Sequence, residues 1–290
     1  MMSRDAARRA LSFVMVGFCC LAVLIALVPV AMIFFFVVKQ GISALDLNFF
    51  TQMPKPPGET GGGMANAILG TLILCGLGAT FGVPVGIFSG IYIVESGGTR
   101  LANAARFAAD TLNGVPSIVV GLFAYVLVVL PVAKAGGGGF SALAGGFALG
   151  MMMIPLVART TEELLRLVPT SLREGALALG ATRGRAVFTV VLPAALPGII
   201  TGVILALARI AGETAPLLFT AFNNRFWSTK LTEPMASLTV QVYTYAKSPS
   251  EDWHRQAWAG ALVLAAIVLT CSILARLATR RLERMHYTGG

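Results

Sequence analysis

The chain has 290 residues, of which 56% are hydrophobic and 12% charged, and its mean hydropathy is +0.80. Soluble domains carry about 25% charged residues and about 45–50% apolar ones, so this composition excludes a water-facing surface over most of the chain. The formal net charge of +9 is explained by arginines beside anionic lipid at a membrane surface. No compact basic and aromatic patch indicates a nucleic-acid partner.

Six uncharged apolar runs follow one another along the chain: Ala10–Val38, Thr60–Val94, Thr111–Ala133, Ala135–Ala158, Ala186–Ala208 and Gln256–Ala275. Each is at least as long as the roughly 20 residues that a membrane-spanning helix needs. They are continuous and lack the alternation of polar and apolar residues found in a barrel wall. The first run is too long for the apolar region of a signal peptide, about 7–15 residues. We therefore predict an all-α integral membrane protein with six spans and an uncleaved first helix.

The basic residues predict the orientation of these spans. With the N-terminus on the cytoplasmic side, 14 of the 22 Lys and Arg residues lie in inner segments, 7 lie in outer segments, and Arg209 lies within a span. This bias in short loops is what the positive-inside rule describes. We expect a multi-pass protein of the bacterial plasma membrane, surrounded by lipid, with both termini in the cytoplasm.

Neither metal chemistry nor ATP hydrolysis is indicated. The four cysteines (Cys19, Cys20, Cys75 and Cys271) all lie within apolar runs, and His254 and His286 are isolated, so no ligand spacing is present. The chain contains no Gly-Lys pair and therefore no P-loop. We expect no metal or cofactor and no ATPase site.

The third inner segment, Arg159 to about Pro193, is polar and contains two helix-start patterns. Thr160–Glu163 and Ser171–Glu174 both match the capping box, with a hydroxyl at the N-cap and Glu three residues later. Pro169 separates them. The second pattern predicts a short amphipathic helix with Leu172, Ala176 and Leu179 on one stripe, closed by a left-handed cap at Gly180. By itself this element is either a solvated connector or a docking site for a partner.

The residues of this loop resemble the EAA loop of ABC importer permeases. The match comprises Glu174, Gly175, Ala176, then Gly180 after three residues, and Val190–Pro193; Gly175 departs from the family's usual Ala. The resemblance implies that the short helix fits a groove on an ATP-hydrolysing subunit, and small residues there permit close approach. It implies the following docking residues: Ser171, Arg173, Glu174, Gly175, Ala176 and Gly180.

More of the chain is similar to the phosphate-specific branch of this family. The similar segments are Met64–Thr71, Asp110–Phe123, Ala208–Leu218 and Pro234–Tyr243, and the last favours the A-type over the C-type permease. The resemblance implies a type I importer core of five helices in residues 60–280. Residues 1–59 would add the first helix and an outer loop, and residues 281–290 a cytoplasmic tail. It also implies a C-type permease, two ATP-binding subunits, an extracytoplasmic phosphate-binding protein and inorganic phosphate as partners.

Arg209 and Glu213 are charges within the fifth apolar segment, which we expect to span about Leu196 to Phe222. Arg209 would then lie near the middle of the bilayer, and a spacing of four places both residues on one helix face. A charge at that depth costs about 2.5–3.5 kcal/mol on insertion scales, so it faces a partner or an aqueous path. The residues alone leave open a structural ion pair and a guanidinium that binds phosphate oxygens. The resemblance, which matches a functional arginine and glutamate to these positions, favours transport.

Arg159 is either a snorkelling arginine at the inner surface or, as the resemblance implies, part of the substrate path. Asp110, four residues after Arg106, is expected to form an ion pair at a helix end, and Asn113 to Ser117 are expected to loosen that helix. The outer segment Asn223 to Arg255 is an interfacial helix or a re-entrant hairpin, and the expected contact for a binding protein.

Two other functions stay open. The nearest is a permease for another oxyanion such as sulfate or molybdate. A proton-coupled secondary transporter with a buried Arg–Glu pair is the other, although we find no internal repeat of the kind common in such proteins.

Overall fold

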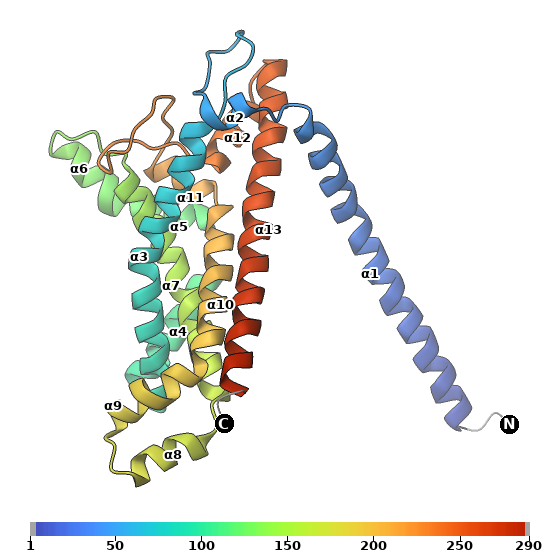
Figure 1. Cartoon of the computed structure of the whole chain (residues 1–290), viewed down its shortest axis with the longest axis vertical. Helices are drawn as coiled ribbons and strands as arrows, with labels where there is room; N and C mark the ends of the chain where they lie inside the picture. The colour runs from blue at the N-terminus through green and yellow to red at the C-terminus, as the bar shows by residue number, and fades with distance from the viewer. Residues whose placement is uncertain (1–3, 288–290) are drawn as a thin grey trace.

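The computed structural model describes residues 4–287, and every regular element in that range is helical. Six helical stretches are long and apolar enough to cross a membrane: Leu11–Ile42, Ala65–Glu95, Ser117–Lys134, Ala142–Leu167, Arg183–Ala211 and Glu251–Leu277. The prediction of an all-α protein with six spans is thereby confirmed. The helical bundle has two opposite ends. We call them the α8 end and the α12 end, after the short helix that lies at each (Figure 1).

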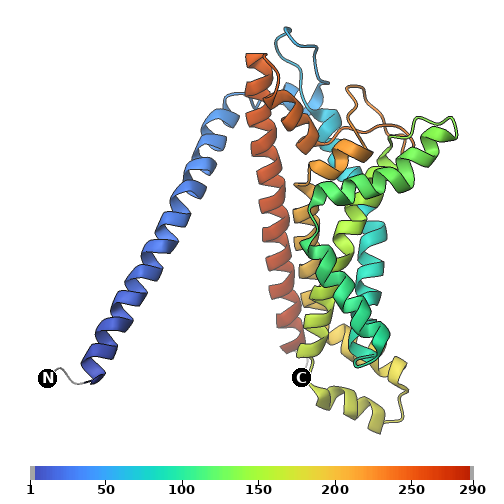
Figure 2. The same cartoon turned by 180° about the vertical axis from the view of Figure 1, so that it is seen from behind.

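The first helix, α1 (Arg4–Ile42), diverges from the rest of the bundle and meets it only near the α12 end (Figures 1 and 2). There it contacts α13 (Glu251–Tyr287). A Cβ atom at Gly41 would lie 2.9 Å from Cβ of Leu262, so the two helices approach closely at this point. The apolar side chains of α1, such as Phe13 at 78% exposure, lie outside the packed core of this chain. The short helix α2 (Leu47–Thr51) leads from α1 to the second span.

The centre of the fold is the pair formed by α3 (Ala65–Glu95) and α7 (Ala142–Leu167), which share the largest helix–helix interface. Four glycines of α3 recur at intervals of four and face α7: Gly78, Gly82, Gly86 and Gly90. A Cβ atom at Gly82 would lie 2.8 Å from both the carbonyl oxygen of Gly150 and Cβ of Met153. Small residues at this spacing let helix backbones approach closely in a membrane. The two helices therefore pack as one tight unit.

The third span begins later than the sequence predicted. Residues from Thr111 onward were expected to enter the membrane, but α4 (Arg100–Gly114) is a separate helix that lies against the α8 end of α7. The chain is extended at Val115 and Pro116, and α5 (Ser117–Ala124) then starts the span. This break confirms the predicted loosening between Asn113 and Ser117. A π-helical segment, Tyr125–Val129, and α6 (Leu130–Lys134) complete the span.

The fifth span begins and ends earlier in the chain than predicted. It consists of α9 (Arg183–Ala186), a π-helical segment Val187–Val191, and α10 (Leu192–Ala211). Its end at Ala211 lies well short of the far ends of α3 and α13 (Figure 1). A separate short helix, α11 (Ala215–Thr220), follows a turn. The expected continuous helix up to Phe222 is therefore wrong.

The long segment between the last two spans folds back onto the bundle. Its helix α12 (Leu238–Ala246) packs on α13 and α3 at the α12 end. Before α12, Met235 and Ala236 are buried, and the backbone N–H of Leu238 donates a hydrogen bond to Oγ1 of Thr71 at 2.8 Å. Gly70 is required for this approach, because a Cβ atom there would collide with the carbonyl oxygen of Ala236. The segment thus has a buried stretch followed by a short helix, and the choice between an interfacial helix and a re-entrant hairpin stays a prediction.

Candidate functional site

Helix α8 (Thr170–Ala178) projects from the bundle at the α8 end and contains no buried residue (Figure 1). Its main contacts are with α9 and the following π-helical segment. Leu179, which follows it, is 91% exposed. A Cβ atom at Gly175 would meet nothing within 4 Å, so the helix presents an open surface. The predicted residues Ser171, Glu174 and Gly175 are all exposed on it.

The turn after α8 has the predicted left-handed glycine. Gly180 has φ of +85°, a region that L side chains enter only with strain. Its N–H donates to the carbonyl of Leu177 at 2.9 Å, and the N–H of Ala181 donates to that of Ala176 at 3.1 Å. These are the two bonds of the Schellman motif. The prediction of a left-handed cap at Gly180 is confirmed.

Both predicted capping boxes are wrong. Thr160–Glu163 starts no helix, because α7 continues without interruption to Leu167. The second box fails because α8 begins at Thr170 with Pro169 as its N-cap, and no side chain caps it. Proline has a fixed φ and no N–H that would need a partner, so the helix starts directly after Pro169, before Ser171 is reached. The predicted separation of the two helices at Pro169 is confirmed.

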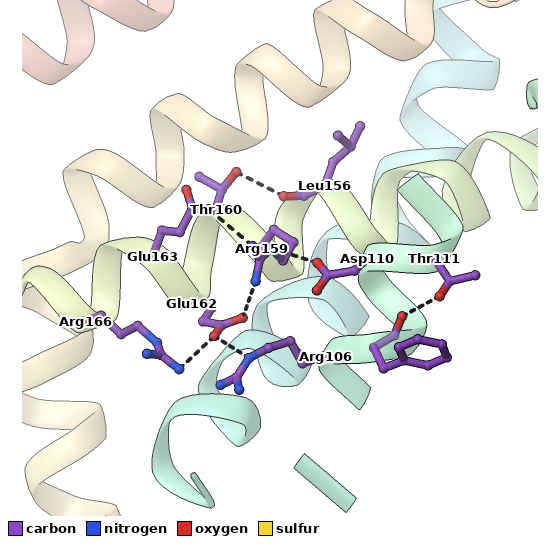
Figure 3. A network of polar contacts seen from close by, with 10 residues as sticks. Arg106, Asp110, Thr111, Leu156, Arg159, Thr160, Glu162, Glu163 and Arg166 are labelled. Carbon is purple, nitrogen blue, oxygen red and sulfur yellow. Dashed lines mark hydrogen bonds and ion pairs between the residues drawn. The ribbon is translucent and has the colours of Figure 1, made fainter. Parts of the chain in front are cut away.

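Arg159 lies in a network of charged side chains that joins α4 to α7 (Figure 3). Its Nε is 3.1 Å from Oδ1 of Asp110, and its Nη1 is 3.3 Å from Oε2 of Glu162. A weaker contact of 3.9 Å reaches Glu163. Asp110 thus pairs with Arg159 of another helix, and the expected pair with Arg106 is not the one formed. The guanidinium of Arg159 is occupied by carboxylates here, and its side chain is 35% exposed.

Glu162 is the centre of this network. Its side chain is only 3% exposed, and three arginines reach it. Oε1 accepts a hydrogen bond from Nε of Arg106 at 2.8 Å and lies 3.0 Å from Nη2 of Arg166, while Oε2 contacts Arg159. A buried carboxylate requires such partners. Sequence reasoning had placed Glu162 in a capping box and missed this role, although three basic residues around a polar helix end were visible.

Arg209 and Glu213 do not form the expected arrangement. Arg209 lies in the last turn of α10, and Glu213 follows the end of that helix after Gly212, so spacing by four no longer places them on one helix face. Within residues 4–287 no ion pair joins them. Arg209 is exposed on the side of α10 that also presents Leu205, whereas Glu213 is partly buried. Their predicted position at the centre of a continuous helix is therefore wrong.

The turn that carries Glu213 is held from the α12 segment. Oγ1 of Thr239 donates a hydrogen bond to the carbonyl oxygen of Glu213 at 3.0 Å. Oγ1 of Thr239 also lies 3.2 Å from Oγ of Ser237, which is itself buried. The side chain of Glu213 is left available, because this bond uses its backbone. The hydrogen bond from Thr239 thus holds the turn between α10 and α11 in place.

The 223–237 segment is also tied at the α12 end. Nδ2 of Asn66 donates to the carbonyl of Asn224 at 2.7 Å. Glu233 accepts hydrogen bonds from Nζ of Lys230 and Oγ of Ser228, both at 2.9 Å. These bonds, that of Lys230 first, lower the pKa of the Glu233 carboxyl. Phe226 remains 80% exposed on this segment.

Nothing in the described range resembles a metal centre: residues 4–287 bring together no group of three or more His, Cys, Asp or Glu side chains placed to hold an ion. The charged groups seen at the candidate site are guanidinium and carboxylate groups, and α8 adds an exposed surface.

Residues 82–285 match the model of the family described as "Binding-protein-dependent transport system inner membrane component". The chain belongs to this family. The family is one of membrane permease components, which supports the prediction of a permease rather than an enzyme. Family membership and the six apolar spans together show that the chain is a multi-pass membrane protein.

Curated members of the family are similar over most of their length. The phosphate transport system permease protein PstA of Yersinia pestis is 48% identical over 84% of this chain and 81% of its own. That of Haemophilus influenzae is 44% identical over 91% and 92%. A probable PstA of Methanocaldococcus jannaschii is 35% identical over 89% of both chains.

Solved structures show the same fold in more distant permeases. A chain of the bacterial alginate ABC transporter, in complex with an alginate-bound periplasmic protein, superposes with a TM-score of 0.66 at 17% identity, over 97% of both chains. A chain of the MetNI methionine ABC transporter gives 0.62 at 20% identity, over 76% of this chain and 95% of its own. The predicted type I importer permease fold is thereby confirmed.

Proposed function

We propose that the chain is the A-type permease of an ABC importer that moves inorganic phosphate into the cytoplasm. The observation that carries this proposal is the 35–48% identity to phosphate transport permeases over more than four fifths of the chain. In this proposal the α8 end is cytoplasmic, both termini lie on that side, and the chain pairs with a C-type permease. An extracytoplasmic phosphate-binding protein delivers the anion at the α12 end.

Energy is supplied by two ATP-binding subunits that dock on α8. Two features support this: α8 contains no buried residue, and a Cβ atom at Gly175 would meet no atom of this chain within 4 Å. The Schellman turn at Gly180 connects α8 to α9 and so sets the orientation of α8 relative to the bundle. Ser171, Glu174, Gly175 and Ala176 are the proposed contact residues, with Gly180 shaping the turn.

Arg209, Glu213 and Arg159 are the proposed contacts of phosphate along its path. The position of Arg209 supports this role, because its side chain is exposed in the last turn of α10. Broken membrane helices of this kind are common at transporter binding sites. A charged side chain exposed within a membrane-spanning segment needs a partner or an aqueous path. In this proposal the partner of Arg209 is the phosphate dianion or a group of the second permease. Arg159 lies at the opposite end, where Asp110 and Glu162 hold its guanidinium.

The proposal is tested by uptake of radiolabelled phosphate into cells that lack other phosphate importers and express the chain with its partner subunits. Uptake is expected to persist when the proton gradient is collapsed and to stop when ATP is depleted. Excess sulfate or molybdate should leave it unchanged. Competition by either anion would assign another oxyanion, and dependence on the proton gradient would assign a secondary transporter.

A further inference from the structure

Arg173 turns back from α8 to the bundle and contacts the last residue of α3. Its Nη1 lies 2.8 Å from Oε1 of Glu95, and the two side chains are 31% and 24% exposed. Oε1 of Glu95 is shielded from solvent, and Arg173 is the charged group the structure brings to it. Arg173 had been predicted to dock on the ATPase, but its guanidinium is already engaged within this chain.

The two sides of α8 differ accordingly. Arg173 and Leu177 line a cleft of about 200 Å3 together with Glu95, Arg183 and Ala186. Glu174, Gly175 and Ala178 are exposed elsewhere on the helix. A partner docked on α8 therefore has an open surface to contact without displacing Arg173.

Glu95 is poorly placed unless it has a partner. A carboxylate in the last turn of a helix lies beside the negative end of the helix dipole, where a basic residue is favoured. The positive charge of Arg173, whose Nη1 lies 2.8 Å from Oε1 of Glu95, offsets this. Because Glu95 lies at the end of α3, whose glycine stripe packs on α7, the Glu95–Arg173 contact joins α8 to the α3–α7 unit.

We propose that the Glu95–Arg173 ion pair is the link that transmits movement of α8 to the membrane helices, and that Arg173 is a positioning residue rather than an ATPase contact. This inference rests on the proposed function, since it supposes that α8 is moved by an ATP-binding subunit. Because both side chains are partly exposed, at 31% and 24%, the pair adds little to folding, and each single variant is expected to fold.

The test uses the complete transporter in proteoliposomes, with phosphate-loaded binding protein outside. Arg173→Gln and Glu95→Gln are each expected to co-purify with the ATPase subunits and keep basal ATP hydrolysis. Both should lose stimulation by phosphate-loaded binding protein by about fivefold or more, the scale of linked sites. The double variant should be no worse than either single one, because the two residues act as one link. Arg100→Gln removes an exposed arginine at the same end of the bundle and should behave as wild type.

The charge-swapped variant Glu95→Arg with Arg173→Glu gives an independent readout. It places Arg in the last turn of α3 and Glu near the start of α8, and both positions suit the helix dipoles. Stimulation should return to within about twofold of wild type, as expected when a residue pair acts through mutual contact. A structural defect in either single variant would not be repaired in this way.

Two results overturn the inference. The first is normal stimulation in Glu95→Gln together with loss of ATPase co-purification in Arg173→Gln, which makes Arg173 a docking residue. The second is normal stimulation in both single variants. If the wild-type chain itself fails to bind an ATPase, the proposed function fails instead, so the two failures are distinguishable.

Discussion

Nε of Arg106 lies 2.8 Å from Oε1 of Glu162, and this contact fixes α4 on the α8 end of α7 (Figure 3). The pair joins residues 56 positions apart in the chain. Arg159 and Arg166 meet the same carboxylate. Loss of the Glu162 carboxylate would therefore leave three arginine side chains without this shared partner.

Glu162→Gln is therefore expected to destabilise the protein by about 3 kcal/mol, the effect of removing one partner of a buried ion pair. The measurement is the temperature at which the detergent-purified permease loses its monodisperse elution, and a clear decrease is expected. Glu163→Gln is the matched control, because Glu163 is 66% exposed and 3.9 Å from Arg159. Equal behaviour of the two variants would contradict a central role for Glu162.

The glycine stripe of α3 gives a second prediction. Gly82→Ala places a Cβ 2.8 Å from the backbone of α7 at Gly150, and such overpacking costs about 1–3 kcal/mol. Gly76→Ala lies on the same helix but meets nothing within 4 Å. The yield of folded permease in membranes should fall for Gly82→Ala and stay unchanged for Gly76→Ala. A tolerated Gly82→Ala would show that α3 and α7 separate readily.

Features encoded by neighbouring residues were predictable from the sequence. The six spans depend on local hydropathy, and the left-handed turn at Gly180 depends on a glycine at a helix end. The Glu162 network was not predictable, because Arg106 reaches it from another helix. The end of α10 was missed for a similar reason: Thr239, 26 residues away, holds the carbonyl of Glu213 in the turn.

Gly180 tests the docking of α8. Gly180→Leu has space within this chain, since a Cβ there meets nothing within 4 Å. Its φ of +85° still imposes about 1–2 kcal/mol of left-handed strain. We expect a membrane-inserted chain whose complex assembles poorly and loses coupled ATP hydrolysis. Gly184→Leu, in α9 with no neighbour within 4 Å, separates the effect of φ from that of bulk. Normal substrate-stimulated hydrolysis in Gly180→Leu would remove α8 as the docking element.

Arg209 gives the last prediction, and the absence of an ion pair with Glu213 within the described residues sharpens it. Because neither side chain neutralises the other in this structure, Arg209→Gln and Glu213→Gln should each insert and fold, and their effects on stability should add. A structural ion pair would instead make each single variant worse than the double one.

Transport measurements further separate a structural ion pair from a role of Arg209 in binding phosphate. Arg209→Lys keeps the charge but lacks the forked donors that match phosphate oxygens, so uptake of labelled phosphate is expected to fall sharply. The double variant Arg209→Gln with Glu213→Gln should bind its ATPase subunits and carry no phosphate. Arg255→Gln is the control, because Arg255 is a basic residue at the α12 end that bonds the backbone of Ser43. Wild-type uptake by the double variant would mean that these two residues lie outside the phosphate path, since no anion could then depend on the guanidinium of Arg209.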